Sequence, residues 1–140
     1  MADFSCKIKS SDHTVKLAVE IWLDNNLLQT IDWVQDNQIN WSVDPSDGPH
    51  QLRWVLKNKR SDHTSVVDGK IVNDVLITIN DFVIEDINCD QVLYKLATYQ
   101  HNFNGTGPDT QEGFWGTMGC NGSVALDFSS PIYLWLLEHM

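Results

Sequence analysis

Every second position between residues 15 and 23 carries an aliphatic side chain, and this pattern limits the possible folds more than any other feature of the chain. A period of two is typical of a β-strand with one buried face, whereas an amphipathic helix needs a period of 3.6. The aliphatic face contains Val15, Leu17, Val19, Ile21 and Leu23. The segment therefore predicts a strand that packs one face against a core.

Shorter stretches repeat this alternation and are separated by residues that form tight turns. Turn signals occur at 24–26 and at 44–49, where Asp, Asn, Pro and Gly are concentrated. The chain also contains 22 Val and Ile residues but only four Ala, which favours strands over helices. We expect further strands at 4–8, 27–33, 38–43, 52–56, 75–87 and 124–128.

Three segments deviate from this pattern. Residues 91–99 place apolar side chains at helical spacing, which predicts one or two turns of helix. The continuous apolar run 132–137 follows Pro131 and is too short to cross a bilayer, so we interpret it as a last strand that closes the core. Residues 58–74 are expected to form a polar loop.

These elements predict one domain, residues 1–140, with an all-β fold. The length suits a single core, and turn signals every eight to twelve residues favour an antiparallel β-sandwich. We expect a jelly-roll-like arrangement with at most one short helix.

The net charge of −10 restricts the partners of the chain. Nucleic acids and anionic membranes attract basic surfaces, so we expect neither as a partner. The N-terminus has no basic region followed by an apolar stretch, so we do not expect secretion through a cleaved signal peptide.

Familiar catalytic motifs are missing from the sequence. It contains no G-x-S-x-G nucleophile elbow, no phosphate-binding G-x-x-x-x-G-K-[ST] loop and no H-E-x-x-H zinc motif. We therefore predict that the protein is not an enzyme and acts by binding.

Calcium is a candidate cofactor, because Ca²⁺ is held by oxygen ligands that commonly come from loops. Asp62, Asp68, Asn73 and Asp74 supply such oxygens within one polar segment. The spacing does not follow the EF-hand pattern, so solvated turn carboxylates are the alternative interpretation.

Four tryptophans are candidate binding residues. Trp22 lies opposite the aliphatic face of its strand, Trp33 and Trp115 are near predicted loops, and Trp135 lies in the C-terminal apolar run. Exposed indoles either stack against sugar rings or bury against neighbouring subunits. The sequence leaves both alternatives open.

Several stretches resemble a known class of protein. The segments HQLRWVLKNK at 50–59 and VDGKIVNDVLITI at 67–79 are similar to small β-sandwich virion proteins of tailed phages, particularly cyanophages. The segments GCNG at 119–122 and FSSPIYLWLL at 128–137 add to this likeness. The middle stretch also resembles, more loosely, calcium-dependent carbohydrate-binding jelly rolls.

The first resemblance implies a structural virion component, such as a decoration, tail or fibre-associated protein. Such a protein is made in the host cytoplasm and contacts other virion proteins or further copies of itself. The second implies the alternative, a carbohydrate-binding module that recognises host-surface glycans, with calcium as its candidate cofactor.

Overall fold

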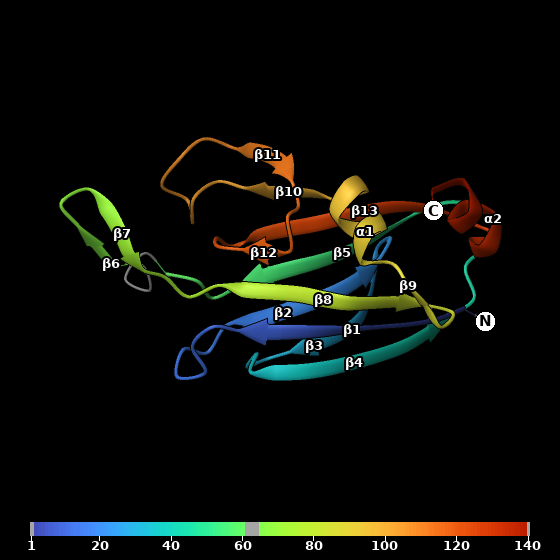
Figure 1. The fold of residues 1–140 in the computed structure, drawn as a ribbon, viewed down its shortest axis with the longest axis horizontal. Coiled ribbons are helices and arrows are strands. Elements are labelled where there is room, and N and C mark those ends of the chain that lie inside the picture. Colours follow the sequence, from blue (N-terminus) through green and yellow to red (C-terminus); the bar gives the residue numbers. More distant parts are fainter. Residues whose placement is uncertain (1, 61–64, 140) are drawn as a thin grey trace.

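Two antiparallel sheets, packed face to face, form the body of the protein (Figure 1). The computed structural model describes residues 2–60 and 65–139. The first sheet contains β12 (Thr117–Met118), β8 (Ile77–Ile84), β1 (Ala2–Ser10) and β4 (Asp36–Val43), and β9 (Ile87–Asn88) pairs with β8. The second sheet contains β11 (Thr110–Gly113), β10 (Thr98–His101), β13 (Gly122–Ser130), β5 (Gly48–Lys57), β2 (Ala18–Leu23) and β3 (Asn26–Ile31).

The predicted all-β antiparallel sandwich is confirmed. The chain crosses repeatedly from one sheet to the other, because β1, β4, β8, β9 and β12 belong to the first sheet, whereas β2, β3, β5, β10, β11 and β13 belong to the second. These crossings give the jelly-roll-like character that the turn spacing predicts. None of the described helices is long and apolar enough to span a membrane.

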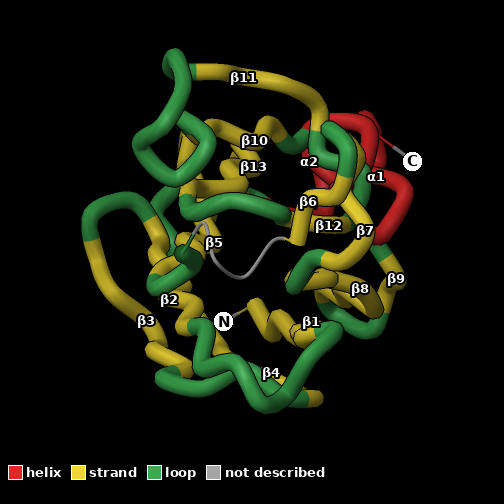
Figure 2. Tube along the Cα trace, turned by 90° about the vertical axis from the view of Figure 1, so that its left-hand side faces the viewer, coloured by secondary structure: helices red, strands yellow, loops and turns green. Residues whose placement is uncertain are grey.

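The two sheets face each other (Figure 2), and their inner faces share one apolar core. Leu17, Val19 and Ile21 are fully buried, as the alternation predicts, although β2 itself begins at Ala18. Aromatic rings join the sheets, since the centroids of Trp54 in β5 and Phe82 in β8 lie 5.4 Å apart in an edge-to-face contact.

Helix α1 (Asp90–Leu96) confirms the predicted helix, whereas the strand predicted at 132–137 is wrong. That segment forms helix α2 (Ile132–His139), so the described residues form two short helices where at most one was predicted. A continuous apolar run has no period of its own, and Pro131 is compatible with the start of a helix. Ile132, Trp135 and Leu136, at i, i+3 and i+4, are buried against the sandwich.

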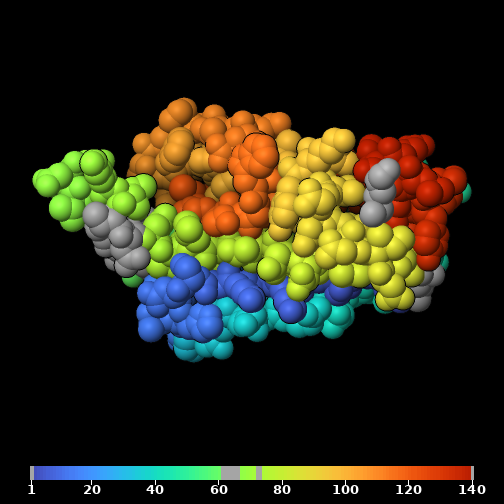
Figure 3. Space-filling view, in the orientation of Figure 1, coloured from blue at the N-terminus to red at the C-terminus, as the bar shows by residue number. Residues whose placement is uncertain are grey.

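The polar loop predicted at 58–74 contains a hairpin of β6 (Ser65–Val67) and β7 (Lys70–Asn73). Its turn is Asp68–Gly69, and both residues have positive φ, +53° and +76°. Two successive positive φ angles are typical of the type I′ turn, for which Asp-Gly is a preferred sequence. The hairpin pairs with neither sheet and projects from the body (Figures 1 and 3).

An ion pair ties the start of β5 to the turn between β2 and β3. His50 Nδ1 lies 2.8 Å from Asp24 Oδ2, and His50 Nε2 lies 2.6 Å from the carbonyl oxygen of Ser46. Because both ring nitrogens face acceptors, the pKa of His50 is raised, chiefly by the hydrogen bond to Asp24. The hydrogen bond from His50 lowers the pKa of Asp24.

We expect this pair to make stability depend on pH. The raised pKa of His50 means that its contribution is fully present below the ordinary value of 6.5 and is lost as the pH rises through the folded-state pKa. The lowered pKa of Asp24 means that its contribution is present above 3.8 and is lost as the pH falls through the folded-state pKa. The difference in Tm between the wild type and His50→Asn should therefore be largest near ~pH 5 and smaller at ~pH 9. Calorimetric scans at the two pH values measure it, and an equal difference at both would contradict the assignment.

Candidate functional site

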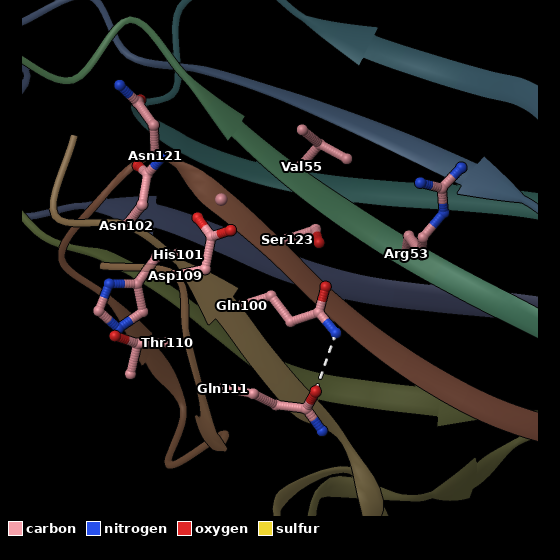
Figure 4. A pocket seen from close by; sticks show the side chains of 11 residues that line it. Arg53, Val55, Gln100, His101, Asn102, Asp109, Thr110, Gln111, Asn121 and Ser123 are labelled. Carbon is pink, nitrogen blue, oxygen red and sulfur yellow. Dashed lines mark hydrogen bonds between the residues drawn. The ribbon is translucent and has the colours of Figure 1, made fainter. Parts of the chain in front are cut away.

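A polar groove lies on the outer face of the second sheet (Figure 4). Its floor follows from strand register, because Gln111 pairs with Gln100, Gln100 with Ser123, and Ser123 with Val55. These side chains point outward, since their chain neighbours Tyr99, Val124 and Trp54 are buried. The groove has a volume of about 690 Å³ and is lined by Arg53, Val55, Gln100, His101, Asn102, Asp109, Thr110, Gln111, Asn121, Gly122 and Ser123.

The lining is dominated by neutral hydrogen-bonding groups. The amide Nε2 of Gln100 donates to Oε1 of Gln111 over 3.1 Å, which leaves the Gln111 amide nitrogen for other partners. Asp109 contributes a carboxylate and Arg53 a guanidinium, and Figure 4 shows them on different sides of the groove. One charge of each sign among several amides and hydroxyls suits a polar, uncharged ligand.

The loop between β10 and β11 forms one wall of this groove. Asn102 holds the loop in a tight turn, since its Oδ1 accepts the N–H of Gly105 over 2.9 Å. Asn104 then joins the loop to the start of β13, because its Oδ1 accepts the N–H of Asn121 over 2.8 Å. The wall is therefore fixed to the strand that forms the floor.

Gly122 is needed where β10 and β13 meet. A Cβ at this position would lie 2.1 Å from the carbonyl oxygen of Gln100 and 3.0 Å from the Cβ of His101. The two strands approach this closely because position 122 has no side chain.

Two of the four predicted tryptophans flank the groove. Trp115 is 82% exposed, and a Cβ on Gly113 would lie 3.4 Å from its ring. Gly113 is two residues beyond Gln111 on the same strand, so both positions face outward. The Trp115 indole therefore lies on the outer face, roughly 7 Å along the strand from Gln111. Trp22 also faces outward, with the guanidinium carbon of Arg53 5.7 Å from its ring centroid.

The other two tryptophans lie elsewhere. Trp33 follows β3, and its Nε1 donates to the carbonyl oxygen of His13 over 2.9 Å. Trp135 is buried, with its ring centroid 6.1 Å from that of Phe128, so it stabilises the attachment of α2 to the sandwich. Its indole is not part of an exposed surface.

The predicted calcium ligands are not brought together where the structure describes them. Asp62 lies outside the described residues, as does the side chain of Asn73. Asp68 is at the hairpin tip and Asp74 at its base, separated by Gly69 and the four residues of β7, which span roughly 13 Å of strand. Within residues 2–60 and 65–139, the described side chains include no group of three or more His, Cys, Asp or Glu suited to a metal ion.

A buried lysine supports the end of the groove. The Lys59 side chain is completely buried, and its ammonium donates to Asp74 Oδ1 over 2.7 Å and to the carbonyls of Val75 and Gly119. Asn121 makes two further hydrogen bonds with the backbone of Lys59, of 2.8 and 2.7 Å. These bonds fix the loop 119–121, from which β13 continues into the groove floor.

The sequence did not single out the groove residues. Gln100, Gln111 and Ser123 are ordinary polar residues of strands, and only the pairing of β10, β11 and β13 gathers them on one face. The sequence did indicate which residues of each alternating segment face solvent, and a binding surface on a sheet must consist of such outward-facing residues.

No family model matches the chain, and neither a curated protein nor a solved structure matches it. The function of the groove is therefore inferred from its own chemistry.

We expect Lys59→Met to lower the free energy of unfolding by about 3 kcal/mol. The change removes a buried cation from beside Asp74 and leaves two buried carbonyls without this donor. The matched control is Lys7→Met, which breaks the exposed 3.2 Å ion pair with Asp81. This variant should lower the free energy of unfolding by less than about 1 kcal/mol. Urea unfolding measures both variants, and equal losses would show that the Lys59 contacts are unimportant.

Proposed function

We propose that this protein is a non-catalytic binding protein that recognises carbohydrate in the groove on its second sheet. The observation that carries the proposal is the position of the exposed Trp115 indole beside a row of outward-facing amides and hydroxyls. This is the combination that sugar rings require, since they present apolar C–H faces and polar hydroxyl edges.

The chemistry of the groove supports a neutral sugar over a charged ligand. Amide side chains both donate and accept, so Gln100, Gln111 and Asn121 can satisfy hydroxyl groups that also do both. A phosphate would meet only one guanidinium, Arg53, and would be repelled by Asp109.

The architecture also favours recognition of a preformed shape. Most lining residues stand on paired strands, which hold their side chains more rigidly than a mobile loop does. The volume of about 690 Å³ is within the usual range for small-molecule sites.

We expect Trp115→Ala to weaken glycan binding by about tenfold in Kd, because it removes a stacking surface. Gln111→Ala should also weaken glycan binding, because it removes an amide. The probe is an immobilised panel of neutral oligosaccharides of glucose, galactose and mannose, followed by calorimetry with the best binder. Trp33→Ala is the matched control, since that indole lies off the groove. The proposal fails if no oligosaccharide binds, or if the control weakens binding as much as Trp115→Ala does.

We also propose a second role, as a structural component of a phage virion that binds neighbouring subunits. The sequence resemblance suggests it, and the exposed apolar side chains of α2 favour it. Tyr133, Leu134 and Leu137 are exposed on the outer side of this helix. Three large apolar side chains on one short helix are typical of an interaction surface.

A further inference from the structure

The sandwich has two chemically different ends, which we call the helix pole and the hairpin pole (Figure 1). The helix pole comprises α2 and the turns 44–47 and 85–86, where β1, β4, β8 and β13 have their ends. The hairpin pole comprises the β6–β7 hairpin and the segments 9–16 and 57–60, at the opposite ends of the same strands. The poles thus lie at the two extremes of the strand direction.

Each pole exposes apolar side chains. Leu137 is 78% exposed on α2, beside the exposed Tyr133 and Leu134. The opposite side of α2 is anchored in the core, so this stripe is held in a fixed orientation. At the other end, Ile71 is 67% exposed on the projecting hairpin, and Val67 is also exposed. A two-stranded hairpin has little stability alone and gains it by packing against another surface.

The two poles also differ in charge. The turns 44–47 and 85–86 and the segment 131–140 contain five carboxylates and no Lys or Arg (Asp44, Asp47, Glu85, Asp86 and Glu138). The hairpin pole contains two carboxylates, Asp12 and Asp68, and six of the nine cations of the chain, of which Lys59 is buried against Asp74 (Lys9, Lys16, Lys57, Lys59, Arg60 and Lys70). Lys70 adjoins the exposed Ile71, and Glu138 adjoins the exposed Leu137. Asp68 adjoins the exposed Val67 on the same hairpin, so the charge complementarity to α2 comes from Lys70 and from the excess of cations at the hairpin pole.

We propose that the hairpin of one copy of this protein docks on the outer face of α2 of a second copy, head to tail. Pairing of two helix poles would oppose carboxylate to carboxylate, which is unfavourable, whereas pairing of unlike poles brings Lys70 towards Glu138. The partner is thus a second copy of this chain. A head-to-tail interface closes into a ring or grows as a filament. The inference rests on the proposed structural role and is independent of the groove.

Light scattering coupled to size exclusion tests the docking over a range of protein concentrations. The wild type should increase in mass with concentration beyond two chains. Ile71→Asp and Leu137→Asp should each remain monomeric, because each carries a charge in one of the two patches. Both positions are exposed, so the variants should keep the Tm and circular dichroism of the wild type. Leu27→Asp is the matched control, an exposed position level with the middle of β5, and should assemble as the wild type does.

The decisive sample is an equimolar mixture of the two pole variants. Each variant keeps one intact patch, so the intact hairpin of Leu137→Asp can dock on the intact α2 of Ile71→Asp. The mixture should therefore contain dimers and nothing larger. A mixture that stays monomeric, or a single variant that still assembles, overturns the head-to-tail docking. If the wild type and both variants assemble equally, the structural role remains supported but these two surfaces are not the interface. A wild type that is monomeric throughout rejects self-assembly itself.

Discussion

The buried ammonium of Lys59 joins parts of the chain that are far apart in sequence. Its acceptors are on the segment before β8 and on the loop before β13, and Lys59 itself follows β5. Removing a charge from water is unfavourable by several kcal/mol unless hydrogen bonds replace the lost solvation, and here three acceptors do so. The two sheets are thereby locked at one end, and Asn121 and Gly122 are held where the groove requires them.

The same alternation that builds the core also creates the outer face that carries the groove. Each inward residue of β10, β13 and β5 fixes an outward neighbour, so the packing of Tyr99, Val124 and Trp54 determines where the groove side chains point. Core and site are therefore two faces of the same strands. A substitution that shifted the register of β13 by one residue would exchange the two faces and destroy both.

The longer strands, the sandwich and helix α1 were predictable because their signals are local: a period of two, a helical spacing and turn residues. Strands β6, β7, β10, β11 and β12 are short and lie in segments where no strand was predicted. Local signals do not determine which strands pair, and for that reason Gln100 and Ser123 could not be recognised as neighbours. The burial of Lys59 was hidden for a similar reason, since its acceptors lie 15 to 60 residues away. The C-terminal segment was misassigned because six consecutive apolar residues satisfy a strand and a helix equally, and only contact with the sandwich decides between them.

The two proposed roles use different surfaces and are compatible. The groove lies on the broad outer face of the second sheet, whereas the apolar patches of Ile71 and Leu137 lie at the poles. Copies joined pole to pole would therefore repeat the groove along the assembly. Repetition matters for carbohydrate recognition, because linked sites bind a surface far more tightly than a single site does. An assembly of this kind would convert a weak groove into a strong attachment to a glycan-covered surface, and it would do so without any further contact to the sugar.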